Sequence, residues 1–231
     1  MKIDKTTVKS LPLFKDMNDA DLDVFLDHAS IRRVAQGEPV FKQAQQADNF
    51  FLLLNGRLKV TQVTGDGQQV IVRVVHPGEL FGFAVALQRP DYPGTAQAAI
   101  ESEVLVWPSE LWSQLIECNG RAAVSAIQTM GKQLEDAHTR IREMSTQEVE
   151  RRVAHAILRL SLLAGRKGGG GIEIAFPISR QDIAEMTGTT LHTVSRVLSA
   201  WEAQGLVECG RQKVIVRDLD GLSRLAEGTR G

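Results

Sequence analysis

The stretch that decides the fold is Pro177-Ile-Ser-Arg-Gln-Asp-Ile-Ala-Glu-Met-Thr-Gly-Thr-Thr-Leu-His-Thr-Val-Ser-Arg-Val-Leu-Ser-Ala-Trp-Glu-Ala-Gln-Gly-Leu206. Ser179 can cap the start of a helix, and Asp182, three residues later, can return a hydrogen bond as in a capping box. Gly188 stands where the chain must turn sharply, and the two threonines after it can cap a second helix. The pattern therefore predicts two short helices joined by a tight turn.

The second of these helices has an apolar side and a polar side. Four apolar residues fall at core spacing: Val194, Val197, Leu198 and Trp201. Five polar residues near its start face mostly outward: Thr190, His192, Thr193, Ser195 and Arg196. Such groups can donate to phosphates and base edges, and a recognition helix reads DNA with its N-terminal residues. The segment indicates DNA binding, with an ordinary helical hairpin as the alternative because its acids and bases nearly balance.

The regions on either side of this stretch complete a DNA-binding unit. Gly205 ends the helix, and residues 206–217 are typical of a two-stranded wing with Arg211 and Lys213 near its tip. Upstream, a helix is expected over 147 to about 164, and the glycine-rich residues 165–171 are expected to form a surface loop. Several bases lie nearby: Arg151, Arg152, Arg159, Arg166 and Lys167. They either contact the DNA backbone or form a solvated face.

A long helix is predicted immediately before this unit. Residues from about 121 to 145 contain no proline, and apolar or small residues recur in steps of three and four. These positions are Val124, Ile127, Gly131, Leu134, His138 and Ile141. That spacing is typical of a coiled-coil seam, so we expect the helix to join two copies of the chain. The alternative is an amphipathic helix that packs only on its own domain.

The first half of the chain has the pattern of a β-sheet domain. Residues from about 11 to 107 contain short apolar runs punctuated by glycine, and Thr64-Gly-Asp-Gly67 between two of these runs is a strong hairpin signal. Such spacing predicts an antiparallel sandwich or jelly roll. A short helix follows over residues 109–117, with Ser109 as its expected N-cap.

Composition limits the classes of protein and of site. A formal net charge of −1 over 231 residues excludes a whole-protein signature of nucleic-acid binding, so any DNA site must be a local patch. No signal peptide or long apolar run is recognisable, which predicts no membrane contact. The only cysteines, Cys118 and Cys209, are far apart, which suits a reduced cytoplasmic setting and structural thiols. A zinc site or a cysteine-ligated iron–sulfur cluster would need more ligands.

Six motifs together resemble the cyclic-AMP receptor protein/FNR (CRP/FNR) family of bacterial regulators over nearly the whole chain. They are Leu11-Pro-Leu-Phe14, Gly37-Glu-Pro-Val-Phe41, Asn55-Gly-Arg-Leu-Lys-Val60, Pro77-Gly-Glu-Leu-Phe-Gly82, Ile178-Ser-Arg-Gln-Asp-Ile-Ala184 and Thr193-Val-Ser-Arg196. The resemblance implies an α+β chain with a β-roll sensor over 1–120, a dimerisation helix over 121–146 and a winged helix-turn-helix over 147–231. It further implies a homodimer on a pseudo-palindromic operator, working with RNA polymerase.

The resemblance also assigns the DNA contacts. Ser179, Arg180 and Gln181 match family residues that hold phosphates. Ser195 and Arg196 match residues that read bases. His192 falls where many members have a glutamate that accepts from a cytosine amine, so the common half-sites of the two best-known branches are not expected. A solvent-facing residue near DNA is the alternative role for His192.

The matched effector pocket departs from that of cyclic-nucleotide binders. Gly94 stands at the position of their phosphate-binding arginine, and Phe83 follows Gly82 where an acidic residue usually grips the ribose. Ala137 and His138 replace the Thr-Ser pair that contacts adenine. A phosphodiester would therefore be buried without its guanidinium, so cyclic AMP is not expected. Oxygen sensing of the FNR type is not expected either, because the N-terminal cysteine cluster is missing.

What remains is a mainly apolar pocket for an effector of unknown identity. Its expected lining is Phe81, Gly82, Phe83, Thr95, Ala96, Leu134, Ala137 and His138, with Val85 and Leu87 nearby. The segment Tyr92-Pro-Gly-Thr-Ala-Gln-Ala98 resembles haem- or nitric-oxide-responsive members. A haem would need an axial ligand, for which His138 is the first candidate and His76 the second. A histidine that simply packs in the helix seam is the alternative.

Other functions stay open at this point. The chain could respond to cyclic AMP or cyclic GMP after all, or be a constitutively active member with no effector. An enzyme on a cupin-like roll would need clustered histidines with a carboxylate, and His76 is nearly alone in the roll. No GxSxG, P-loop or HExxH string occurs, so we expect no enzyme. A structural module with its pocket filled by side chains is the last alternative.

Overall fold

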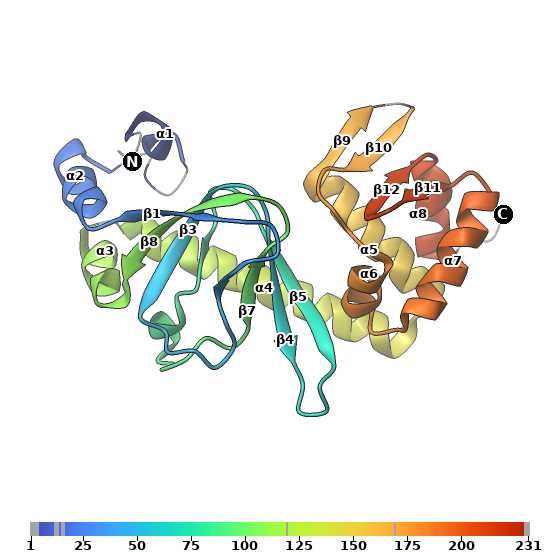
Figure 1. The fold of residues 1–231 in the computed structure, drawn as a ribbon, viewed down its shortest axis with the longest axis horizontal. Helices are drawn as coiled ribbons and strands as arrows, with labels where there is room; N and C mark the ends of the chain where they lie inside the picture. Colours follow the sequence, from blue (N-terminus) through green and yellow to red (C-terminus); the bar gives the residue numbers. More distant parts are fainter. Residues whose placement is uncertain (1–4, 12–13, 15–16, 119, 169, 229–231) are drawn as a thin grey trace. The chain divides into compact units, whose positions relative to one another are not determined.

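The computed structural model describes residues 5–11, 14, 17–118, 120–168 and 170–228, and it contains two compact units (Figure 1). The first unit holds the described residues of 1–68 and 72–135, and the second holds those of 69–71 and 136–231. Strands and helices are largely segregated into separate runs along the chain, as the predicted α+β class requires. None of the described helices combines the length and the apolar character that a membrane crossing needs.

The predicted β-roll is confirmed and is built from two four-stranded sheets. One has the order β1 (Ser30–Val34), β8 (Ser102–Pro108), β3 (Asn49–Asn55) and β6 (Leu80–Phe81). The other has the order β2 (Pro39–Phe41), β7 (Thr95–Ala98), β4 (Leu58–Val63) and β5 (Gln69–Val75). The predicted hairpin turn joins β4 to β5, and the N–H of Gly67 donates to the carbonyl of Thr64 at 2.9 Å.

Strand β3 explains why this part of the sequence is a continuous apolar run. Successive side chains of a strand point to opposite faces. Phe51 and Leu53 face the second sheet, whereas Phe50 and Leu52 belong to a second hydrophobic cluster with Trp107 and the N-terminal helices. Those helices are α1 (Lys5–Lys9) and α2 (Asp19–Asp27). Because β3 is buried on both faces, polar residues do not alternate with apolar ones along it.

The segment after the roll differs from the predicted helix. It begins with a 3₁₀ turn over Ser109–Leu111, and α3 follows over Trp112–Cys118. Ser109 does not cap this helix, so that prediction was wrong. Its hydroxyl is buried and donates instead to the carbonyl of Ala47 at 2.7 Å. A buried hydroxyl must find a partner, and a distant carbonyl supplied it.

The long helix is confirmed as α4 (Gly120–Thr146), which crosses the division between the two units. Its predicted seam stays uncovered by the chain's own described residues. The exposed fractions are 52% for Val124, 67% for Ile127, 58% for Leu134 and 61% for Ile141, and His138 is exposed as well. Ala126 and Met130, by contrast, turn toward the chain's own core. An apolar row of this length normally meets a partner.

Besides the end of α4, the second unit contains four described helices and a sheet. The helices are α5 (Val149–Ala164), α6 (Arg180–Thr187), α7 (Leu191–Ala203) and α8 (Leu219–Glu227). The sheet has the order β11 (Val207–Gly210), β12 (Lys213–Val216), β10 (Gly171–Ile174) and β9 (Gly165–Gly168). Strands β11 and β12 are the predicted wing, which therefore belongs to a larger sheet than expected.

The expected surface loop over 165–171 was wrong, because this segment forms most of the β9–β10 hairpin. Lys167 pairs with Ile172 in its register, and Gly169 lies outside the described residues. Two glycines permit close packing rather than flexibility. A Cβ on Gly165 would lie 2.1 Å from the carbonyl oxygen of Ser161, and one on Gly171 would lie 2.5 Å from that of Val216.

Candidate nucleic-acid interface

A capping box holds the start of α6, as predicted. The hydroxyl of Ser179 accepts from the N–H of Asp182 at 3.0 Å. The Asp182 carboxylate accepts from the Ser179 N–H at 2.7 Å and from the Ser179 hydroxyl at 2.8 Å. These bonds satisfy amides that the first turn of a helix leaves without partners.

The turn between α6 and α7 relies on a glycine and a threonine cap. Gly188 has a φ of +60°, in the left-handed region, and its N–H donates to the carbonyl of Ala184. The hydroxyl of Thr190 accepts from the N–H of Thr193 at 3.2 Å, and the two hydroxyls lie 2.9 Å apart. Both predicted signals are therefore confirmed, and they set the direction in which α7 leaves the turn.

Helix α7 divides as its sequence predicts. Its four predicted core residues are buried: Val194, Val197, Leu198 and Trp201. The indole N–H of Trp201 donates to Glu150 of α5 at 2.9 Å, which ties the helix to the unit. His192 and Arg196 are exposed four residues apart and so share one face, with Ser195 half-buried beside them. Within the described residues, no hydrogen bond or ion pair engages the Arg196 side chain.

The residues expected to hold phosphates lie at the start of α6. Arg180 is partly exposed, with Nη2 3.6 Å from Glu202 Oε2. Gln181 is exposed and donates from Nε2 to Glu185 Oε1 at 3.0 Å. The wing tip is anchored to the same region, because the N–H of Ile178 donates to the carbonyl of Gln212 at 3.0 Å. Arg211, exposed in the wing turn, is therefore held near the start of α6.

Three of the neighbouring arginines form hydrogen bonds or an ion pair within their own unit, a role that neither interpretation from the sequence included. Arg151 donates to the carbonyls of Ala226 and Glu227 at 3.0 and 3.1 Å, at the end of α8. Arg152 donates to the carbonyl of Thr187 at 3.1 Å, at the end of α6. Arg159 pairs with Glu143. Carbonyls at helix C-termini need such donors. Arg166 and Lys167 remain exposed.

The single described thiol in this unit fits a structural role. Cys209 is half-buried in β11, and its N–H donates to Glu202 Oε1 at 2.9 Å. Burial above all, then the charge of Glu202, raises the pKa of its thiol to about 11. The thiol is therefore protonated and unreactive at neutral pH. The side chain of Cys118 lies outside the described part of the chain.

The exposed face of α7 can serve chemically as a reader of nucleic acid. A helix N-terminus carries partial positive charge and free N–H groups, which favour phosphate oxygens. Guanidinium, imidazole and hydroxyl groups on the same face match the donors and acceptors at base edges. The arrangement is a winged helix-turn-helix, held by capping bonds and a buried tryptophan.

Comparison with known proteins agrees with this arrangement. A Crp-like helix-turn-helix domain matches residues 151–225, and a cyclic nucleotide-binding domain matches residues 31–119. The chain belongs to the CRP/FNR family. It is therefore a DNA-binding transcription regulator of the CRP/FNR type, and the relatives it matches are regulators rather than enzymes.

Two curated relatives span nearly the whole of this CRP/FNR regulator. The chain is 29% identical to the cyclic AMP receptor protein of Thermus thermophilus, covering 96% of this chain and 99% of that one. It is 28% identical to the transcriptional activator protein FnrA of Stutzerimonas stutzeri, covering 94% and 88%. A solved CRP-family regulator from Thermus thermophilus matches with a TM-score of 0.72 at 25% identity, covering 85% of this chain and 96% of that one.

The structure places the expected effector residues of this regulator in several different settings. Phe81 and Ala96 are buried in the cluster between the two sheets, whereas Phe83 belongs to the other cluster and stacks on Trp112 with ring centroids 5.7 Å apart. Gly82 has a φ of +69°. The hydroxyl of Thr95 accepts from the N–H of Gln43 at 3.0 Å. The three residues of α4 that were expected to line the effector pocket are exposed: Leu134, Ala137 and His138.

Stacked aromatic rings occupy the space between the sheets. The rings of Phe41 and Tyr92 stack with centroids 3.9 Å apart, and Phe51 stacks on Phe81 at 5.2 Å. The Tyr92 hydroxyl donates to the carbonyl of Asn49 at 2.7 Å, and burial raises its pKa to about 12. This part of the roll is therefore a packed core, and sequence reasoning missed the role of Tyr92 in it.

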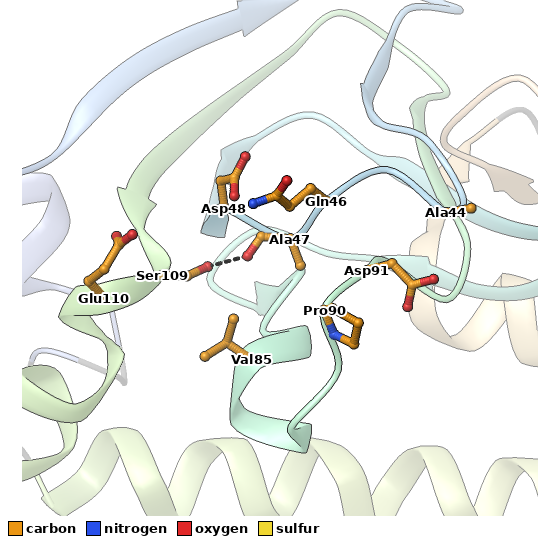
Figure 2. Close-up of a pocket in the computed structure, with 9 residues that line it drawn as sticks. All are labelled: Ala44, Gln46, Ala47, Asp48, Val85, Pro90, Asp91, Ser109 and Glu110. Carbon is orange, nitrogen blue, oxygen red and sulfur yellow. Dashed lines mark hydrogen bonds between the residues drawn. The ribbon is translucent and has the colours of Figure 1, made fainter.

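A pocket of about 510 Å³ opens elsewhere on the roll (Figure 2). Its lining is Ala44, Gln46, Ala47, Asp48, Val85, Pro90, Asp91, Ser109 and Glu110. Figure 2 shows the bond from Ser109 to Ala47 on its wall and carboxylates around it. Of these residues, only Val85 was expected from the sequence to lie near a pocket. Val85 lies on the short 3₁₀ helix Ala84–Leu87, which no sequence signal placed beside Pro90.

His76, the second candidate haem ligand, lies in a charged corner of the roll. Its Nδ1 is 3.7 Å from Oε1 of Glu79, whose Oε2 accepts from Arg73 at 3.0 Å and from the His76 N–H at 3.2 Å. Burial raises the pKa of Glu79, but the bonds from His76 and the charge of Arg73 outweigh it and leave that pKa lowered. The corner is built to hold an ionised carboxylate.

Proposed function

We propose that this regulator is a cytoplasmic homodimer that binds a pseudo-palindromic operator through α7 and responds to a small effector other than cyclic AMP. The observation that carries the proposal is the exposed pair His192 and Arg196 on a helix whose opposite side is anchored by Trp201. In this proposal residues 1–120 sense, 121–146 dimerise and 147–231 read DNA. RNA polymerase is the expected protein partner.

The DNA contacts divide into positioning and reading groups. Ser179, Arg180 and Gln181 hold phosphates, because they cluster at the N-terminus of α6. Bases are read by the face of α7 that carries His192, Ser195 and Arg196, with the hydroxyls of Thr190 and Thr193 beside it. An arginine fork suits guanine, and an imidazole replaces the usual carboxylate, so we expect an operator that differs from those of glutamate-bearing relatives.

Selection of bound DNA from a random-sequence library tests this function directly. We expect the selected sites to be two inverted half-sites with centres about one helical turn apart, because a two-fold dimer presents two recognition helices. Affinity for the selected site should be on the order of 10³-fold or more above that for random DNA. Recovery of unrelated sequences, or of a single half-site, would contradict the proposal.

The effector proposal rests on Gly94, at the place of the family's phosphate-binding arginine. Gly94 is buried, and a Cβ there would lie 2.7 Å from the carbonyl oxygen of Thr61. The backbone of β4 therefore stands where an arginine side chain would begin. This supports a branch of the family without cyclic-AMP binding, and the haem-ligand roles of His138 and His76 stay predictions.

Restoring the arginine should therefore fail to restore nucleotide binding. We expect Gly94→Arg to bind no cyclic AMP in calorimetric titration and to lose about 1–3 kcal/mol of unfolding free energy in urea, because overpacking forces the backbone apart. Gly65→Arg is the matched control, since no atom lies within 4 Å of a Cβ there. Micromolar cyclic-AMP binding by a Gly94→Arg protein of unchanged stability would refute this.

One observation favours a second candidate, a family member that acts without any effector. The aromatic rings of Phe41, Phe51, Phe81 and Tyr92 fill the space between the sheets of the roll. A regulator of this kind would bind the selected operator with full affinity when purified without small molecules. An operator affinity that rises on addition of a host metabolite extract, and falls again on dialysis, would exclude it.

A further inference from the structure

The N-terminal end of α7 carries an exposed apolar side chain among polar ones. Leu191 is the first residue of this helix and is 47% exposed, and its neighbours Thr190 and His192 are exposed and polar. Among the large apolar residues of α6, α7, β11 and β12, all of which lie in the described chain, Leu191 is the exposed one. A single exposed leucine has no meaning on most surfaces, so its position decides what it can do.

The helix places Leu191 at one edge of the proposed reading face. Residues four apart are neighbours on a helix surface, so Leu191 adjoins the half-buried Ser195, and His192 adjoins the exposed Arg196. The two pairs are separated by about 100° around the helix axis, because each begins one residue after the other. Val194, by contrast, is fully buried on the other side.

The side chain of Leu191 extends ahead of the helix rather than along it. Each Cα–Cβ bond in a helix tilts toward the N-terminus, and Leu191 has no earlier helical turn to cover. The hydroxyl of Thr190 stays beside the helix, because it accepts from the N–H of Thr193 at 3.2 Å. A recognition helix contacts base edges with its N-terminal residues. Leu191 is therefore among the first groups to reach the floor of a major groove.

The major groove offers one apolar group to such a side chain, the 5-methyl group of thymine. Leucine has no donor or acceptor, so against any other base edge it would leave polar groups without water or a partner. We propose that Leu191 is a specificity-determining residue that reads a thymine methyl group in each half-site of the operator. The inference rests on the proposed function and names one base of the site.

The position of this thymine is limited by the length of the chain. Consecutive Cα atoms are about 3.8 Å apart, and successive bases of one strand are about 3.4 Å apart. Leu191 directly precedes His192. The thymine should therefore lie within roughly two base pairs of the one that His192 contacts.

Deoxyuridine in place of thymine tests the inference, because it removes only the methyl group and keeps every hydrogen-bonding group. The operator is the one recovered from the random-sequence library. Each thymine of the half-site is replaced in turn, in both half-sites at once, and gel-shift titrations at fixed salt give the affinity. At one position we expect the unmodified protein to lose roughly threefold for each half-site, or about tenfold for the symmetric operator.

Variants of Leu191 assign that loss to this side chain. We expect Leu191→Ala to bind the thymine operator about tenfold more weakly than the unmodified protein, and to bind the thymine and deoxyuridine operators equally well. Leu191→Gln, which keeps the length but not the apolar surface, should be insensitive in the same way. Leu162→Ala is the matched control, because Leu162 is an 80% exposed leucine on α5 of the same unit, and it should keep the full tenfold loss.

Urea unfolding shows whether each variant is folded, and Leu191→Gln carries the test if Leu191→Ala is not. The inference is overturned if the folded variant loses as much affinity on deoxyuridine as the unmodified protein at every thymine. It is also overturned if the variant weakens binding to operator and random DNA equally, since that result marks a contact with the DNA backbone. Either outcome leaves the operator, and with it the proposed function, intact. A library that yields no preferred sequence contradicts the proposed function and the inference together.

Discussion

Arg196→Ala should remove most of the discrimination between operator and random DNA while the protein stays folded and dimeric. Arg196 is exposed on the face of α7 opposite its buried core, and no described residue engages its side chain. A bidentate arginine–guanine contact contributes about 1–3 kcal/mol of discrimination, and a dimer uses it twice. We therefore expect operator affinity to fall by roughly two orders of magnitude, since about 1.4 kcal/mol corresponds to a factor of ten.

Gel-shift titrations at fixed salt measure this effect, because affinity for DNA depends strongly on salt. Arg196→Lys should keep the affinity for random DNA but lose most discrimination, since an ammonium lacks the planar fork. Arg224→Ala, at an exposed arginine on α8, removes the same charge elsewhere and should leave operator affinity nearly unchanged. Operator affinity that survives in Arg196→Ala would remove this residue from the proposed reading face.

Ile127→Asp should convert the dimer into monomers. Ile127 is 67% exposed in the described chain and belongs to the N-terminal part of the predicted seam. Two-fold symmetry would bring two new carboxylates together in an interface that had been apolar, at a cost of several kcal/mol. We expect the dissociation constant of the dimer to rise roughly a hundredfold or more, equivalent to about 2.8 kcal/mol.

Analytical ultracentrifugation over a range of concentrations checks this prediction. Lys132→Asp is the control. It lies at an exposed position of α4 outside the seam and changes the charge by two units, whereas Ile127→Asp changes it by one. That variant should remain dimeric. Because Ile127→Asp should be monomeric, its operator affinity should fall as well, since each monomer reads only one half-site. A dimer that persists in Ile127→Asp would place the interface away from this row.

The parts of the fold that were predictable are those specified by neighbouring residues. The capping box at Ser179, the turn at Gly188 and the hairpin at Thr64 each depend on atoms a few residues apart, so their signals lie in short stretches. The apolar run of β3 indicated a buried strand in the same way. Motifs carried by several such elements also sufficed to suggest the family.

The errors lie where a residue's partner is distant in the chain. Ser109 was expected to cap its own helix, but the carbonyl of Ala47 accepts its hydroxyl. The glycines at 165 and 171 indicate flexibility when the sequence is read alone. In the fold they allow backbones to approach closely. Arg151 and Arg152 suggested a DNA-facing patch, yet they serve helix ends about 75 and 35 residues further along.

By itself, the sequence determined that this chain carries a β-roll, a long helix and a winged helix-turn-helix, and which side of α7 is polar. Periodicity and capping decide these features, because both act within one or two turns of helix or one strand pair. Only the tertiary structure decided that aromatic rings fill the roll and that Glu143 is buried against Arg159. Burial and pairing depend on which distant segments meet, and a local pattern does not record that.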